Sequence, residues 1–377
     1  MKRSSHSRTS ERRVLAPGDH AIIRACLADS HDLVAALDEC FSRTDPDDYG
    51  HSAQQLFGFL YRRLVDEDLD HPTKPALGRV YKRTWHQTQL LIFRARPLFA
   101  RLEALGARPL VLKGGAMASS AYYDDLGVRP LMDLDVLVDR PLVAPLVDWA
   151  EANGWRVSKG LDARDFYLVH HAIDLEDGAG GAVDVHWALL VQGRDATRDL
   201  ELVHSGESAT LNDLPIEVLP PTFQLFHTVA HAKPEGIRHL VDVVNIVRAY
   251  PDQIDWDLLV DEVLTRRTIS YAQHTLDLVE QIAPDVIPAA AHQRLAEATR
   301  HWSDYEFHGT EIRSRREGFR RLAADVSSRA RGESLLQKAR VARAMVHRFA
   351  QSNELSGRDL VSGLLRRGPR GLRSDDS

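Results

Sequence analysis

The sequence predicts an α+β fold, in which a small mixed β-sheet has helical regions before and after it. Apolar residues recur every three or four positions up to about residue 105 and again after residue 221, as in amphipathic helices. Short apolar runs bounded by glycine and proline lie between these regions and are typical of buried strands. The 377 residues, 44% hydrophobic and 27% charged, have an ordinary globular composition. At roughly 100–200 residues per domain, they suggest two or three domains, or one core with helical additions.

The predicted organisation has five parts: a disordered N-terminus at 1–15, a helical region at 16–105, an α/β core at 106–220, a helical domain at 221–310, and a basic helical tail at 311–377 whose end is disordered. The first residues are rich in serine and arginine, and no apolar segment follows them, so no secretory signal is predicted. No run of about 18 apolar residues predicts a membrane helix. The only cysteines, Cys26 and Cys40, fit a reducing compartment, and we expect a cytoplasmic protein without a membrane partner.

The first helical region divides at Pro72 and Pro75, which interrupt its apolar periodicity. The longest amphipathic pattern follows, from Tyr81 to Leu105, and Gly106 directly after it is a typical helix cap. We therefore expect one long helix to lead into the α/β core.

Strand and helix patterns alternate in the core. The expected strands and extended segments are Pro109–Leu112, Leu131–Val138, Phe166–Leu175, Ala182–Leu190 and Pro215–Leu219. Small residues after Gly115 suit a tightly packed helix, and Pro141 opens a second helix that Gly154 closes. The glycine-rich run 178–181 predicts a hairpin loop. From Phe223 to about Phe349 the periodicity is helical again.

Charge is distributed unevenly along the chain. The whole sequence has a formal net charge of −6, but residues 311–377 contain 16 Lys and Arg against 8 Asp and Glu. Such a tail fits either a solvated helical face or contact with RNA, DNA or another acidic partner. It lacks the interleaved aromatic residues of a base-stacking surface, which favours the solvated face.

Two carboxylates stand two positions apart in one predicted strand. Because side chains alternate across a strand, Asp133 and Asp135 share one face, while Leu134 and Val136 point to the other. Two carboxylates on one face repel each other unless a cation lies between them. Mg²⁺ prefers such oxygen ligands and keeps positions free for phosphates. The pair therefore predicts a metal seat, although a solvent-facing polar strand is the simpler interpretation of the motif taken alone.

The context favours the metal seat. Gly114 and Gly115 lie between a predicted strand and a predicted helix, where glycine lets backbone N–H groups approach a phosphate. The start of the helix adds a dipole that favours anions. A phosphate cradle and a carboxylate pair in one short unit suit a nucleotide-handling protein.

Together these motifs resemble a known superfamily. Leu112-Lys113-Gly114-Gly115 followed by Asp133-Leu134-Asp135 is similar to the signature of the polymerase-β-like nucleotidyltransferases. One branch, the uncharacterised bacterial nucleotidyltransferase family, is closest, since it similarly has an arginine before Asp-x-Asp, here Arg129, and a later Asp-x-His-Trp, here residues 184–187. The resemblance covers about Tyr81 to Val247. The 18 positions between Gly115 and Asp133 exceed the spacing common in the superfamily.

The resemblance implies roles for individual residues. Asp133 and Asp135 would bind two catalytic Mg²⁺ ions (Mn²⁺ is an alternative), and Asp184 would complete the metal site from a neighbouring strand. Gly114 and Gly115 would hold the triphosphate. From their positions, Lys113 and Arg129 are further candidates for phosphate binding. A solvent-exposed lysine at a strand end and an arginine paired with Asp124 or Asp125 remain the alternatives.

Several histidines offer a competing metal site. His170, His171 and His186 would meet across the predicted hairpin, near Asp174 or Asp184, as ligands for Zn²⁺ or Mn²⁺. His227 and His231 lie four apart on one predicted helix face. Without a tight His-x-His or His-Glu-x-x-His motif, packing and hydrogen bonding are the preferred interpretation, with His186 supporting the strand beside the site.

The implied activity is metal-dependent transfer of a nucleoside monophosphate, AMP from ATP, with release of pyrophosphate. The acceptor is left open among a small molecule, a peptide, a protein and an RNA end. Two other classes remain as alternatives: an inactive nucleotide-binding or scaffold protein, and a nucleic-acid-binding protein acting through the basic tail.

Overall fold

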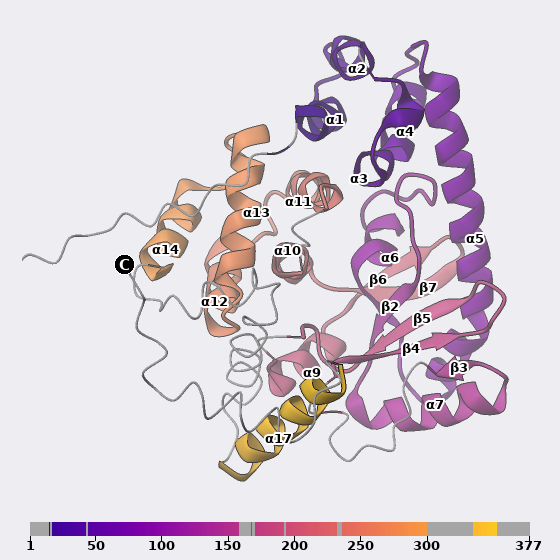
Figure 1. Cartoon of the computed structure of the whole chain (residues 1–377), viewed down its shortest axis with the longest axis vertical. Coiled ribbons are helices and arrows are strands. Elements are labelled where there is room, and N and C mark those ends of the chain that lie inside the picture. Colours follow the sequence, from indigo (N-terminus) through magenta and orange to yellow (C-terminus); the bar gives the residue numbers. More distant parts are fainter. Residues whose placement is uncertain are drawn as a thin grey trace, which may run out of the picture.

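A seven-stranded mixed β-sheet lies toward the lower right of the view in Figure 1, with helices around it. The computed structural model describes residues 15, 17–42, 44–157, 167, 170–191, 194–231, 236–299 and 335–352. A mixed sheet combined with many helices confirms the predicted α+β class.

The sheet is built from β1 (Leu110–Val111), β2 (Leu134–Leu137), β3 (Arg156–Val157), β4 (Ala172–Glu176), β5 (Ala182–His186), β6 (Glu207–Leu211) and β7 (Leu214–Val218). Their order across the sheet is β3-β4-β5-β2-β1-β7-β6. β2 pairs with β5 and β1 with β7 in parallel, and the other neighbouring pairs are antiparallel. The sheet therefore places β2 at its centre, beside β5, which begins 48 residues after β2 begins.

Five of these strands overlap the segments that the sequence predicts, and β1, β2 and β5 lie wholly within them. β2 begins at Leu134, so Asp133 lies directly before the strand. β4 occupies only the end of the predicted segment 166–175, part of which lies outside the described residues. The hairpin loop between β4 and β5 is confirmed, with positive φ angles of 74° at Gly178 and 102° at Gly180. The sequence did not predict β3, β6 or the helix α9 (Ala196–His204).

The predicted helical region before the core is confirmed. Its helices are α1 (Pro17–Leu27), α2 (Leu33–Phe41), the 3-10 turn η1 (Pro46–Asp48), α3 (His51–Gln54), α4 (Phe57–Asp66) and α5 (Lys74–Ala104). The long helix α5 begins at Lys74, seven residues before the predicted start at Tyr81, because Pro75 lies in its first turn rather than in a break. Proline is tolerated there, where its missing N–H has no partner in the helix.

The two faces of the sheet pack into two cores. Val111, Val136 and Val185 share a core with α5 and with α7 (Val143–Ala152), which follows the 3-10 turn η2 (Arg140–Leu142). Leu110 and Leu137, one position away on their strands, belong to the other core. This period-two alternation is what places the carboxylates of β2 and β5 on the face opposite α5.

The other core joins the beginning and the end of the described fold. Residues of α1, α2 and α4 pack in one cluster with α10 (Pro221–Ala230), α11 (Arg238–Ala249), α12 (Trp256–Thr265), α13 (Ile269–Ile282) and α14 (Ala289–Thr299). α1 contacts both α11 and α13. The helical regions predicted at 16–105 and 221–310 thus share a core, while the domain boundaries themselves stay a prediction.

Most of the predicted basic tail lies outside the described residues, as do the predicted disorder at its end and nearly all of the predicted disorder at 1–15. The described part of the tail is α17 (Leu335–Ser352), which buries Val341, Ala344 and Met345 while Leu335 and Leu336 are exposed. None of the helices in the described ranges has the length and apolar character needed to cross a bilayer.

Close backbone packing of α4 against the segment before β2 gives the first prediction. A Cβ atom at Gly58 would lie 2.1 Å from the carbonyl oxygen of Gly127, and that backbone atom has no freedom to move aside. We expect Gly58→Ala to lower the free energy of unfolding by about 1–3 kcal/mol, the usual cost of overpacking. Chemical denaturation measures the loss.

Gly18→Ala in α1 is the matched control. Its Cβ would meet the Tyr49 side chain at 3.5 Å, an ordinary contact, so its stability should stay within about 1 kcal/mol of wild type. Equal stabilities of the two variants would contradict the packing described at Gly58.

Candidate active site

Three carboxylates line up across the middle of the sheet. Asp135 on β2 is in direct register with Asp184 on the parallel strand β5, and Asp184 is in register with Asp174 on β4. A hydrogen bond with Asp174 contributes to the lowered pKa of Asp184, and such a bond between two carboxyls requires a proton on one of them. The structure thus brings together Asp135 and Asp184, as the resemblance implies, and adds Asp174 beside them.

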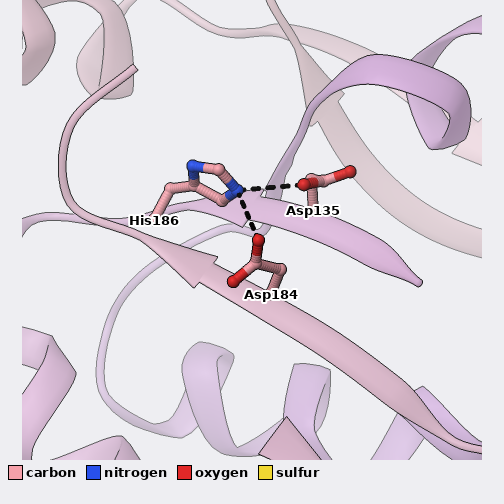
Figure 2. A group of neighbouring side chains, drawn as sticks. All are labelled: Asp135, Asp184 and His186. Carbon is pink, nitrogen blue, oxygen red and sulfur yellow. Dashed lines mark hydrogen bonds and ion pairs between the residues drawn. The ribbon is translucent and has the colours of Figure 1, made fainter. Parts of the chain in front are cut away.

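His186 lies between the two central carboxylates (Figure 2). Its Nε2 is 2.9 Å from Oδ1 of Asp135 and 3.2 Å from Oδ2 of Asp184, and the side chain is fully buried. Its ring contacts that of His171 edge to face, with centroids 5.0 Å apart. His186 is therefore hydrogen-bonded to the site, while its role as a support of the strand stays a prediction. Among the described residues, the potential metal-binding group is Asp135, Asp184 and His186, whose ligand atoms lie within 4.8 Å of one another.

Lys113 approaches Asp135 from the turn after β1. Its Nζ forms an ion pair with Oδ1 of Asp135. The backbone at Lys113 has a φ of 49°, a left-handed conformation that costs energy for any residue with a Cβ atom. Next to it, the N–H of Leu112 donates to the carbonyl of Asp135 at 2.9 Å. The turn is therefore fixed against β2, and Lys113 supplies a cation at the carboxylates.

The electrostatics of the cluster follow from these contacts. Burial alone would raise the pKa of Asp135, but hydrogen bonds and charges of His186 and Lys113 hold it well below its ordinary value. Burial is likewise outweighed at Asp184, whose pKa is lowered, mainly by His186. The pKa of His186 is raised despite its burial, because both carboxylates favour its protonated form.

Asp133 differs from the other two acids. It is exposed, one residue before β2, and lies outside the group of ligand atoms that Asp135, Asp184 and His186 form. Desolvation by the surrounding site and the charge of Asp135 raise its pKa. The site thus places Asp133, Asp135 and Asp184 near one ammonium and one imidazole, an excess of negative charge that favours a bound cation.

Gly114 and Gly115 are the second and third residues of the short helix α6 (Lys113–Ala118), and both are buried. A Cβ atom at Gly114 would lie 2.4 Å from Leu131 and 2.5 Å from the guanidinium of Arg129, and one at Gly115 would lie 2.5 Å from Val111. The glycines therefore allow α6 to pack tightly on β1 and on the segment that leads to β2. Close packing is thus a second reason for glycine at these two positions, in addition to their predicted contact with phosphate.

Arg129 is held by an acid from a distant helix. Its guanidinium forms an ion pair with Asp242 on α11, with Nη2 2.8 Å from Oδ2, and both side chains are nearly inaccessible. The hydroxyl of Tyr123 donates to the other oxygen of Asp242 at 2.9 Å. The partner of Arg129 is thus neither Asp124 nor Asp125, the surface partners considered from the sequence.

Asp125 is engaged elsewhere in the same segment. It accepts hydrogen bonds from Arg62 and Tyr81 and from the N–H of Gly127. These bonds and the Arg129–Asp242 pair tie the segment before β2 to helices on both sides, so that Asp133 and Asp135 have a fixed position.

Two features of the site were outside the sequence-based set. His186 was considered as a ligand of a competing Zn²⁺ or Mn²⁺ site, with support of the strand as the preferred interpretation, and Asp174 was named only as a neighbour of that histidine group. The predicted hairpin loop contained a signal for Asp174, since folding β4 back on β5 around Gly178–Gly181 pairs Asp174 with Asp184. His186 follows Asp184 by two positions, and strand alternation places both on one face.

The buried pair of Arg129 and Asp242 gives a prediction about stability. Arg129→Met should lower the free energy of unfolding by about 3–5 kcal/mol, because it leaves the Asp242 carboxylate buried and unpaired. Adding Asp242→Asn should restore much of the loss, as measured by chemical denaturation of both variants.

The exposed pair of Arg156 and Glu176 is the control, with side chains 73% and 55% accessible. Arg156→Met should cost less than about 1 kcal/mol, the range of surface ion pairs. A similarly small effect at Arg129 would show that its pairing with Asp242 does not hold the segment.

Comparison with known proteins agrees with this geometry. A family model described as "Uncharacterised nucleotidyltransferase" matches residues 51–284, more than half of the chain. The match extends beyond the Tyr81–Val247 range of the motif resemblance, to α3 and α4 on one side and to α12 and α13 on the other. No curated protein matches the chain. The sheet with its paired carboxylates and the family match together show that the chain belongs to the uncharacterised nucleotidyltransferase family.

Proposed function

We propose that this chain transfers a nucleoside monophosphate, AMP from ATP, to an acceptor and releases pyrophosphate, with a divalent cation as cofactor. The observation that carries the proposal is the direct register of Asp135 and Asp184 on parallel strands, with Lys113 beside them, in a member of a nucleotidyltransferase family. Transfer of a phosphoryl group depends mainly on positioning and on stabilising negative charge, and the cluster offers groups for both.

The donor atoms fit a hard divalent cation. Asp133, Asp135 and Asp184 offer carboxylate oxygens, and Oδ1 of Asp184 is buried without a hydrogen-bond partner among the described residues. Oxygen ligands suit Mg²⁺ or Mn²⁺, and the imidazole of His186 is an added ligand that Mn²⁺ accepts. Bound there, such ions would stabilise the charge on the phosphate oxygens. We therefore propose these three acids as the metal ligands.

The remaining residues have roles toward the nucleotide and the acceptor. The ammonium of Lys113, now paired with Asp135, would take a phosphate of the NTP as its partner, and Gly114 and Gly115 would offer their N–H groups to the same phosphates. Arg129 would bind the phosphates only while it stays paired with Asp242. As the acceptor oxygen bonds to the α-phosphorus and the bond to pyrophosphate breaks, Asp184 would accept the acceptor's proton.

The acceptor stays open among a small molecule, a peptide, a protein and an RNA. Cys26 and Cys40 are both buried and free, and this supports the proposal that the protein works in the reducing cytoplasm.

Ligand-dependent stability tests the proposal without knowledge of the acceptor. Thermal unfolding would be followed with each of the four NTPs, with and without Mg²⁺ or Mn²⁺. ATP with the cation should raise the melting temperature by several degrees, because a ligand at 100 times its Kd adds about 2.7 kcal/mol to the stability of the native state. Asp135→Asn should remove this rise and, once an acceptor is found, lower turnover by about 100-fold or more.

Asp252→Asn, at an exposed turn, is the matched control and should keep the full rise. A rise with another NTP instead would change the donor but keep the reaction class. If no NTP stabilises the wild-type protein, or if Asp135→Asn responds as wild type does, the two-metal assignment is wrong and the scaffold interpretation is favoured.

A further inference from the structure

Helix α5 has a strong excess of positive charge. Its 31 residues include seven Lys and Arg but only one acidic residue, Glu103, close to its end, whereas the whole chain has a formal net charge of −6. One side of α5 packs on the sheet, on the face opposite the carboxylates, and Figure 1 shows the helix along the right-hand edge of the view. The outer side of α5 is therefore a basic surface that is separate from the candidate active site.

A groove lies between α4 and the start of α5. It has a volume of about 670 Å³, and Lys74, Arg79 and Lys82 line it from α5. Gly78 allows the ring of Tyr61 on α4 to lie directly against α5, because a Cβ atom at this position would be 2.8 Å from that ring. The groove thus combines an aromatic wall with three cationic side chains, of which Arg79 and Lys82 are exposed to solvent.

The cations of the groove are only weakly balanced by acids. Arg79 forms an exposed ion pair with Asp47 at 3.8 Å, and Lys74 lies 4.0 Å from Asp70, the acid that lines the groove itself. Lys82 has no acidic partner in the part of the chain that the structure describes. Exposed ion pairs contribute little to stability, so their cations can exchange one anion for another. The groove is therefore suited to a ligand that carries several negative charges.

Exposed aromatic residues extend this surface beyond the groove. Trp85 follows Gly78 by seven positions and Lys82 by three, so it lies on the same side of α5, one turn after the groove. The residue is 38% exposed, and its ring contacts that of His86 edge to face, with centroids 5.1 Å apart. Phe93 follows Lys82 by eleven positions, three turns along the same side, and is 66% exposed. Rings that can stack with a ligand therefore lie in line with the cationic groove.

We propose that the outer side of α5, from the groove to Phe93, binds single-stranded RNA. Phosphates of the strand lie in the groove beside Arg79 and Lys82, and bases stack on the rings of Trp85 and Phe93. Proteins that bind single strands combine a cationic groove with exposed aromatic rings in this way. Unpaired stretches are the usual targets on RNA, because the bases of a duplex are already stacked and paired. The inference goes beyond the proposed function, since it requires neither a metal ion nor an NTP.

An anionic membrane is the other partner with matching charge. Helices that lie on bilayers also combine basic residues with exposed apolar side chains. On α5, however, the cations surround a hollow between two helices, and the exposed rings lie further along the helix. A flexible strand can enter such a hollow, whereas the surface of a bilayer cannot. The shape of the groove therefore favours RNA over a membrane.

Fluorescence anisotropy with a labelled oligouridylate of about 12 nucleotides tests this inference. The wild-type protein should bind it without metal or NTP, with a log–log slope of affinity against salt of about −2, as expected for three cations on the phosphates of a single strand. Lys82→Gln should reduce the size of that slope by about 0.7. Trp85→Ala should weaken binding about fivefold or more and leave the slope unchanged. Both side chains are exposed, so both variants should melt as wild type does.

Arg340→Gln on α17 is the matched control, because it removes one positive charge from an exposed residue of the basic tail. It should bind the oligouridylate as wild type does, and so should Asp135→Asn, which alters the metal site alone. RNA binding by a protein that no NTP stabilises would support this inference while the proposed function fails.

The inference is overturned if wild type does not bind the oligouridylate, or if Arg340→Gln loses as much affinity as Lys82→Gln. Binding of phosphatidylserine and phosphatidylcholine vesicles in place of RNA would overturn it in favour of a membrane surface. Tighter binding of an oligothymidylate of the same length would overturn it in favour of DNA.

Discussion

Repulsion between Asp135 and Asp184 is the constraint on which the rest of the site depends. Parallel pairing of β2 and β5 places these two acids side by side on one face of the sheet, and Asp174 extends the row. Buried like charges are costly unless opposite charge balances them. His186 and Lys113 supply that balance from the end of β5 and from the turn after β1. These contacts bring the end of β5 and the turn after β1 to the carboxylates.

A second interaction, between Arg129 and Asp242, relates the sheet to the helices. The two residues are 113 positions apart, and their contact is nearly inaccessible to solvent, where an ion pair is weakly screened. The pair anchors the segment before β2 to α11, which in turn packs against α10. The same contact therefore helps to place the proposed metal ligands of β2.

Local sequence patterns predicted the fold class, the alternation along β2 and the β4–β5 hairpin. The features that these patterns missed depend on contacts between residues far apart in the sequence. Alternation of polar and apolar residues was enough to place Asp135 opposite the core formed by Leu134 and Val136, and the glycine run was enough to predict the β4–β5 hairpin. β3 has two residues, too few for any periodicity, and β6 is placed by its pairing with β7 and its contacts with α6. The ion pair of Arg129 with Asp242 could not be predicted from the sequence around either residue, because nothing near one residue specifies the other as its partner. The position of His186 between two acids likewise depends on which strands become neighbours.

The core shared by the first and last helices has a consequence for synthesis of the protein. α1 packs against α11 and α13 as well as against its neighbour α2, so part of its apolar side is covered only after more than 200 further residues have been translated. At roughly 5–20 residues per second, that delay lasts on the order of 10–40 seconds. During this time the emerging N-terminal helices expose surfaces that attract other apolar chains. We expect the nascent polypeptide to depend on ribosome-associated chaperones, and the finished fold to form as its C-terminal half leaves the exit tunnel.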